Sequence, residues 1–186
     1  MPILPLVDGG TKGAVVAIAQ LSLAGVSSVQ FTNIPAKYQD LMLTLEFNLS
    51  STSSSNIYFQ LGTGGTLDTS TSYANAQFYY SGGTSPTLTG SSGLVSTPTI
   101  GVFSSATGTN SALITANILD YTNTSIYKTV ATEGGKMSPS TAIYLGQTVT
   151  TYTNSTNAIT NLLVGSSAVS FGSGTAYLYG IRTVGQ

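Results

Sequence analysis

The clearest pattern in the chain is an alternation of apolar and polar residues between positions 40 and 50. Apolar residues stand at every second position of this segment: Leu41, Leu43, Leu45, Phe47 and Leu49. Because successive side chains of a β-strand point to opposite faces, the spacing predicts a strand with one buried face. The same alternation returns in residues 57–61 and 111–120, which are predicted as two further strands.

The rest of the chain is divided into similarly short segments. Further strands are predicted over residues 14–23, 28–33, 76–80, 126–132, 142–149, 158–164 and 175–182. Between them lie segments rich in Gly, Ser, Thr and Asn, which are typical of turns: 62–75, 81–93, 104–110, 133–139, 151–157 and 172–174. Helical spacing is absent, apart from one helical turn expected over residues 35–39 with Pro35 at its first position. Many short strands without a repeat of fixed period predict an all-β fold, an antiparallel β-sandwich that is jelly-roll-like, over residues 14–186.

Residues 1–13 differ from this domain and predict an extended N-terminal arm. Pro2 and Pro5 disfavour a regular ladder of hydrogen bonds. Four apolar residues of the arm would have no reason to be apolar in a solvated tail: Ile3, Leu4, Leu6 and Val7. Two interpretations stay open: the arm contacts a neighbouring subunit or the capsid through these residues, or it folds back on its own domain.

The composition limits which polar groups can form the surface of the protein. Charged residues make up 6% of the chain and apolar residues 41%, whereas an average domain has about 25% charged residues. The exposed polar groups must therefore be mainly hydroxyls and amides. With a formal net charge of −1 and only five widely spaced Lys and Arg residues, the chain offers no basic surface for nucleic acid.

No apolar run approaches the roughly 18 residues that a membrane-spanning helix needs, so membrane insertion is not expected. Residues 14–24 resemble the apolar part of a signal peptide, but Gln20 and Ser22 interrupt them. We expect a strand there and an unprocessed chain.

The side chains that most enzymes use are missing. The chain contains no His and no Cys, which excludes a Ser-His-Asp triad, a Cys-His pair and imidazole or thiolate metal sites. Lys128 alternates with Ile126 and Val130 and so has an inward position, but we expect its ammonium group to reach solvent. The acidic residues show no spacing typical of a glycosidase or a calcium loop. We therefore predict a protein that is not an enzyme and needs no cofactor or metal.

Tyrosine is the one enriched chemical group, with eleven copies. Tyr73, Tyr79 and Tyr80 flank the longest predicted loops and are candidates for a ligand-facing loop, because aromatic rings stack on sugars. Tyr is also a favoured strand residue, and strand propensity alone accounts for its frequency.

Two segments resemble a group of tailed-phage virion proteins. Residues 26–41, VSSVQFTNIPAKYQDL, are similar to their opening pattern S-V-x-F-x-N-I-P-x-x-Y-x-D-L, and residues 175–182, TAYLYGIR, are similar to their closing A-x-L-Y-G-I strand. The stretch 61–83, rich in Gly and Tyr, looks like their variable loop. The resemblance covers about residues 17–183, and the arm lies outside it.

The resemblance implies a jelly-roll-like domain of a phage particle, without catalytic residues. The first expectation is a capsid decoration (cement) protein that binds the major capsid protein as a homo-oligomer, with a trimer as the favoured state. The second is a tail-fibre or tail-appendage domain that binds host glycan near Tyr73, Tyr79 and Tyr80. Either way the expected location is the virion, assembled in the host cytoplasm. A cellular lectin is a third expectation that fits the composition but neither segment.

Overall fold

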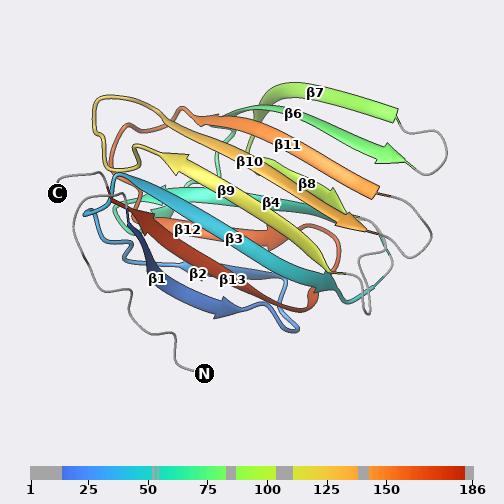
Figure 1. Cartoon of the computed structure of the whole chain (residues 1–186). Helices are drawn as coiled ribbons and strands as arrows, with labels where there is room; N and C mark the ends of the chain where they lie inside the picture. The colour runs from blue at the N-terminus through green and yellow to red at the C-terminus, as the bar shows by residue number, and fades with distance from the viewer. Residues whose placement is uncertain are drawn as a thin grey trace.

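The computed structural model describes residues 14–51, 53, 55–82, 87–103, 111–137 and 143–182. All regular structure in these ranges is β-strand (Figure 1). The strands are β1 Val15–Ser22, β2 Ser28–Phe31, β3 Asp40–Leu49, β4 Ser55–Thr63, β5 Thr66–Leu67, β6 Tyr73–Gly82, β7 Thr87–Val95, β8 Thr99–Phe103, β9 Ala112–Leu119, β10 Lys128–Met137, β11 Ile143–Tyr152, β12 Asn161–Ser166 and β13 Phe171–Ile181. No helix long and apolar enough to cross a membrane occurs in the described residues.

The strands form two antiparallel sheets packed face to face. The larger sheet has eight strands in the order β1-β13-β3-β9-β10-β11-β6-β7. The smaller sheet has the order β2-β12-β4-β5, with β8 also paired to β4. This confirms the predicted all-β antiparallel sandwich, while its jelly-roll-like character stays a prediction.

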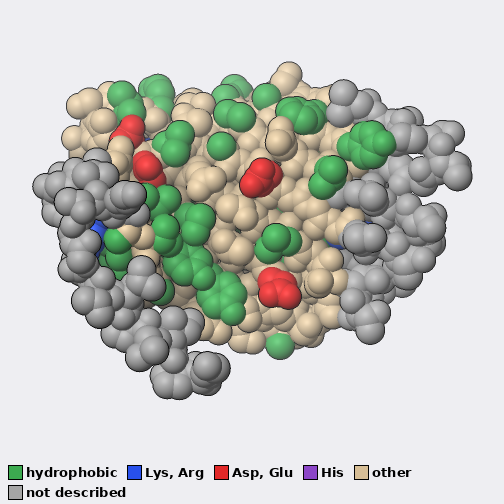
Figure 2. Space-filling view, in the orientation of Figure 1, with side chains coloured by type: hydrophobic (Ala, Val, Ile, Leu, Met, Phe, Trp, Pro, Cys, Tyr) green, Lys and Arg blue, Asp and Glu red, His purple; other side chains and the backbone are tan. Residues whose placement is uncertain are grey.

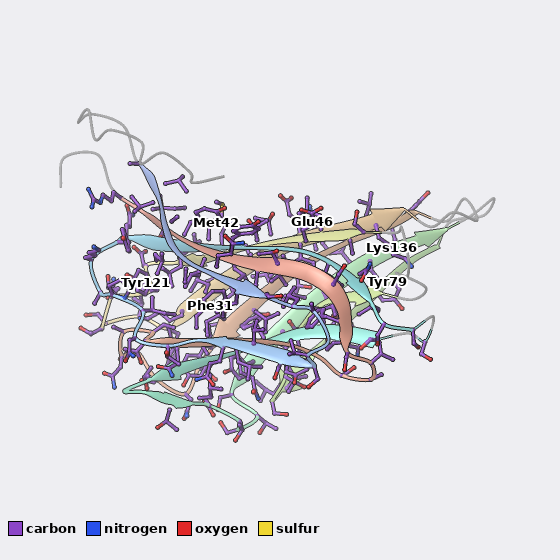
Figure 3. The ribbon with its side chains drawn as sticks, turned by 90° about the horizontal axis from the view of Figure 1, so that it is seen from below. Phe31, Met42, Glu46, Tyr79, Tyr121 and Lys136 are labelled. Atoms are coloured by element: carbon purple, nitrogen blue, oxygen red, sulfur yellow. The ribbon has the colours of Figure 1, made fainter. Side chains whose placement is uncertain are left out.

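The core lies between the two sheets and comes from the alternating segments. The apolar row of β3 faces inward and is fully buried, as are Ile57, Phe59 and Leu61 of β4 in the opposite sheet. Figure 3 shows Phe31 between the layers, whereas Met42 and Glu46 of β3 project from the outer side of the eight-stranded sheet. The period-two pattern therefore predicted both the strands and their buried faces.

Several segments expected as turns contain strand residues instead, among them 62–75 with β5 and 151–157 with the end of β11. Residues 81–93, expected as turn, include most of β7, which pairs with β6 from Tyr73 opposite Val95 to Ser81 opposite Thr87. Residues 133–137 continue β10, and residues 172–174 belong to β13. Gly, Ser and Thr are turn formers in isolation, but here backbone pairing to a neighbouring strand places them in the sheet.

The helical turn expected over residues 35–39 is wrong. This segment is an irregular turn, in which the Lys37 amide donates to the carbonyl of Pro35 at 3.0 Å. The Tyr121 hydroxyl donates to the same carbonyl. The Gln39 amide, which a helical turn would pair with the Pro35 carbonyl, donates instead to the Ile181 carbonyl at 2.8 Å, so the segment closes without a helical hydrogen bond.

The predicted arm, residues 1–13, lies outside the described residues, and so do its candidate contact residues Ile3, Leu4, Leu6 and Val7. The arm and its contacts stay a prediction.

Candidate functional site

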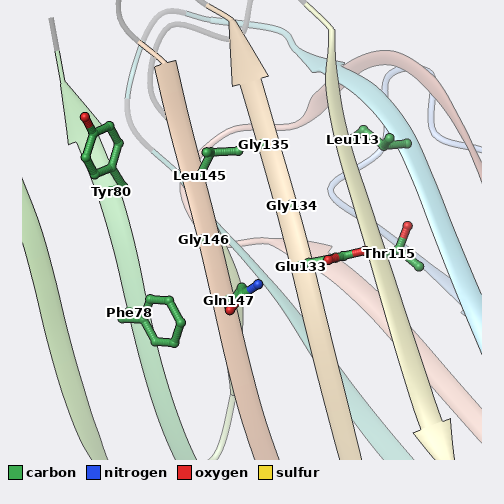
Figure 4. A pocket seen from close by; sticks show the side chains of 10 residues that line it. All are labelled: Phe78, Tyr80, Leu113, Thr115, Glu133, Gly134, Gly135, Leu145, Gly146 and Gln147. Atoms are coloured by element: carbon green, nitrogen blue, oxygen red, sulfur yellow. The ribbon is translucent and has the colours of Figure 1, made fainter. Parts of the chain in front are cut away.

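A groove of about 800 Å³ opens on the outer face of the eight-stranded sheet. Four neighbouring strands line it: β9, β10, β11 and β6 (Figure 4). These strands are brought together by the sheet order, although β6 and β10 begin 55 positions apart in the numbering, at Tyr73 and Lys128. The groove is therefore a product of tertiary pairing and not of a local sequence motif.

The register of the four strands arranges the lining residues in two rows that run across the sheet. The first row is Leu113, Gly135, Leu145 and Tyr80. The second row is Thr115, Glu133, Gln147 and Phe78. Since Gly135 has no side chain, a hollow is left between the two leucines of the first row. The second row contributes the polar groups of the groove: one carboxylate, one amide and one hydroxyl.

The apolar residues around this groove are unusually exposed. We call Phe78, Tyr80, Leu113, Leu145 and Val149 the outer apolar patch. Leu145 is 57% exposed, Leu113 53% and Phe78 50%. Figure 2 shows hydrophobic side chains spread over this face of the molecule. Several exposed apolar side chains gathered around one groove are typical of an interaction surface, whereas single exposed apolar residues are ordinary.

The charge on this face has one sign. Glu133 lines the groove, and Glu46 lies on the same face of the sheet, opposite Leu113 in the pairing of β3 with β9. The cations of the described strands are Lys128 and Lys136, and both side chains are buried on the inner side. The outer face thus carries the carboxylates of Glu133, Glu46 and, at the start of β3, Asp40, and the described strands add no Lys or Arg to it.

The three candidate tyrosines have different places. All three lie in β6 and not in a loop. Tyr73 is fully buried, and its hydroxyl accepts a hydrogen bond from the Leu61 amide at 2.8 Å, so its assignment to a ligand-facing loop is wrong. Tyr79 is half-buried and lies on the inner side of the sheet, as Figure 3 shows. Of the three, Tyr80 is the one that faces the groove, where it is 39% exposed.

Lys128 is buried, contrary to the expectation that its ammonium reaches solvent. Its Nζ donates to the carbonyls of Ile126 at 2.9 Å and Thr156 at 2.8 Å, and also to that of Asn123. Burial lowers the pKa of this ammonium, while the charge of Asp120 acts in the opposite direction. The contacts tie the loop before β10 to the loop after β11, so Lys128 has a structural role.

Metal chemistry has no obvious site in the described residues. They contain no group of three acidic, His or Cys side chains able to hold a metal ion. Asp68 accepts hydrogen bonds from the amide and hydroxyl of Ser70, at 2.8 and 2.6 Å. Burial raises the pKa of this carboxyl, but the hydrogen bonds from Ser70, with others from Asn154 and Tyr152, outweigh it, and the net pKa is lowered.

Most of the groove was missed from the sequence. One signal was present: Leu113 and Leu119 occupy the polar positions of the alternating segment 111–120, where its other face already carries the buried residues. Apolar residues on the solvent face of one strand indicate a binding surface only when adjacent strands add apolar neighbours, and these neighbours become known only with the strand order.

A scan of protein-family models gave no match to this chain, and neither did searches of characterised proteins and of solved structures.

Proposed function

We propose that this protein is a non-enzymatic structural protein of a tailed-phage particle that attaches to other virion subunits through the outer apolar patch. The favoured role is capsid decoration, in which a homotrimer binds the head shell. The single observation that carries the proposal is the exposure of Phe78, Leu113, Leu145 and Val149 on one continuous sheet face. The resemblance of residues 26–41 and 175–182 to phage virion proteins is the reason for proposing that the protein belongs to a phage particle.

The physical argument is the free energy of covering this patch. Burying apolar surface contributes about 25 cal/mol per Å², and several half-exposed large side chains lie close enough to be covered by one partner. The scarcity of charge elsewhere, with six acids and five bases in the whole chain, limits non-specific attraction to other surfaces. Attachment would then depend on the shape and apolarity of this face.

The test compares two charge insertions on purified full-length protein added to particles that lack it. Leu145→Asp places a carboxylate within the patch. Ile126→Asp is the matched control, because Ile126 is another exposed aliphatic residue, at 46%, but lies outside the sheet. We expect Leu145→Asp to abolish co-sedimentation with particles and Ile126→Asp to retain it. Equal binding by both variants would overturn the use of this face.

The number of bound copies decides between head and tail. A copy number comparable with that of the major capsid protein supports decoration, and a handful per particle supports a tail appendage. A protein that never binds particles contradicts the phage assignment.

A second candidate function is host recognition through a glycan. It is favoured by the two half-exposed rings of Phe78 and Tyr80 beside the amide of Gln147. Aromatic rings stack on sugar rings, and an amide can hydrogen-bond to sugar hydroxyl groups. The leucines on the opposite side of the groove and Val149 favour a protein partner instead.

A further inference from the structure

We propose that the groove binds an extended segment of the partner subunit in which an aliphatic residue and a Lys or Arg are separated by one residue. This inference rests on the proposed function, and it names the chemistry of the partner.

The spacing along β10 sets the first requirement. Gly135 and Glu133 are two positions apart on one face of the strand. Same-face residues of a strand repeat about every 7 Å, and an extended partner segment has the same repeat. If an aliphatic side chain of the partner fills the hollow above Gly135, its next same-face side chain therefore arrives over Glu133.

The charge of the groove sets the second requirement. Glu133 is the one charged side chain among the described residues that line the groove. A cation brought over Glu133 forms an ion pair, and Thr115 and Gln147 flank it as hydrogen-bonding groups in the same row. The ring of Phe78 at the end of that row can cover the aliphatic stem of a Lys or Arg side chain.

A second copy of this chain fits less well. A two-fold contact pairs this face with the same face of its partner, and because the described strands add no Lys or Arg to the face, Glu133 would gain no cation as a partner there. The predicted arm also lacks the pattern: Lys12 is two positions from Gly10 and Ala14, and neither has a large aliphatic side chain. A two-fold contact of this face with itself and occupation of the groove by the predicted arm are therefore both disfavoured.

The experiment titrates isotope-labelled full-length protein with short blocked peptides and follows the amide signals by NMR. The probe is Thr-Leu-Thr-Arg-Thr; one control peptide has Glu in place of Arg, and the other has Ser in place of Leu. We expect saturable shifts at the signals of Glu133, Gly135 and Leu145 with the probe, and much weaker shifts with either control.

Two protein variants test whether the carboxylate of Glu133 is the group that attracts the cation of the peptide. Glu133→Gln should weaken binding of the probe by about two- to fivefold, the range of an exposed ion pair. Glu46→Gln removes the same charge from the same face outside the groove lining and should leave the affinity nearly unchanged. Equal losses in both variants, or equal binding of the Arg and Glu peptides, would overturn the proposal.

A neutral oligosaccharide, maltotetraose or chitotetraose, completes the test. Saturable shifts at Phe78 and Tyr80 with a sugar, together with none from the peptides, would reject the peptide groove and assign it to glycan. Failure of the peptides while Leu145→Asp still prevents co-sedimentation would reject this inference and leave the proposed function standing.

Discussion

The ring of Tyr38 packs directly on the backbone of Gly180. A Cβ atom built on Gly180 would lie 2.3 Å from two ring carbons, Cγ and Cδ2. The two residues belong to the two segments that resemble phage virion proteins, residues 26–41 and 175–182. The segments also meet through the backbone, where the Gln39 amide donates to the Ile181 carbonyl at 2.8 Å. The motif residues Tyr38 and Gly180 therefore have a packing role that closes one corner of the sandwich.

Gly180→Ala should destabilise the protein, because the added methyl group meets a buried ring that is only 6% exposed and has little room to move. Overpacking of this kind costs about 1–3 kcal/mol. Urea unfolding measures the loss. The control is Gly93→Ala in β7, where an added Cβ meets nothing within 4 Å. Similar stabilities of the two variants would contradict the packing of Tyr38 on Gly180.

Lys128→Met should also destabilise the fold. The substitution keeps the aliphatic stem but leaves the carbonyls of Ile126 and Thr156, and that of Asn123, without their donor. A loss of roughly 2–3 kcal/mol is expected for buried acceptors left without a partner.

The matched control for this variant is Lys37→Met, which removes the same charge from an exposed side chain. The Lys37 ammonium lies 5.4 Å from the centre of the Tyr38 ring, a contact that contributes about 0.5–1 kcal/mol at an exposed site. A smaller loss in Lys128→Met than in Lys37→Met, by chemical denaturation, would show that the three carbonyl contacts add no stability.

Strands and their buried faces could be predicted from the sequence, because they depend on the local spacing of apolar residues. The groove and the contacts of Lys128 could not, because they depend on which strands and loops the fold brings together. The alternation around Leu43 is enough to define a strand and its buried face, because one side chain in two must leave the solvent. The groove needed the strand order, since Phe78 and Leu113 come from strands separated by β10 and β11 in the sheet. The surroundings of Lys128 were missed for the same reason: its acceptors lie in two loops that only the fold brings together.

Tyr73→Phe and Tyr80→Phe should separate a core tyrosine from a groove tyrosine. The Tyr73 hydroxyl accepts from the Leu61 amide at 2.8 Å, and its removal leaves that buried donor unpaired at a cost of about 1–2 kcal/mol. Tyr80 is 39% exposed, and loss of its hydroxyl should change the free energy of unfolding by less than about 0.5 kcal/mol. Thermal and urea unfolding check both values, and a larger loss for Tyr80→Phe would contradict the assigned places.

The stability of the protein should fall above pH 10.5 because of its buried tyrosines. Burial raises the pKa of Tyr73 and raises that of Tyr152 to about 12, with the Asp68 carboxylate adding to the shift at Tyr152. A raised pKa in the folded state means that the group stabilises the fold fully below its ordinary value of 10.0, and that this contribution is lost as the pH rises to the folded value. For Tyr152 the loss therefore falls between pH 10 and about 12.

The buried lysines do not obscure this window. The pKa of Lys128 and that of Lys136 are lowered by burial, so these groups change stability only below the ordinary value of 10.5, where stability rises with pH. Urea unfolding measured between pH 10.5 and 12 should thus show a decline, and Tyr152→Phe should make that decline shallower. The phenolate absorbance of the folded protein gives an independent measure, because ionisation of Tyr73 and Tyr152 should appear only as the protein unfolds. If the free energy of unfolding falls equally steeply with pH in Tyr152→Phe and in the unaltered protein, groups other than Tyr152 cause the loss of stability at alkaline pH.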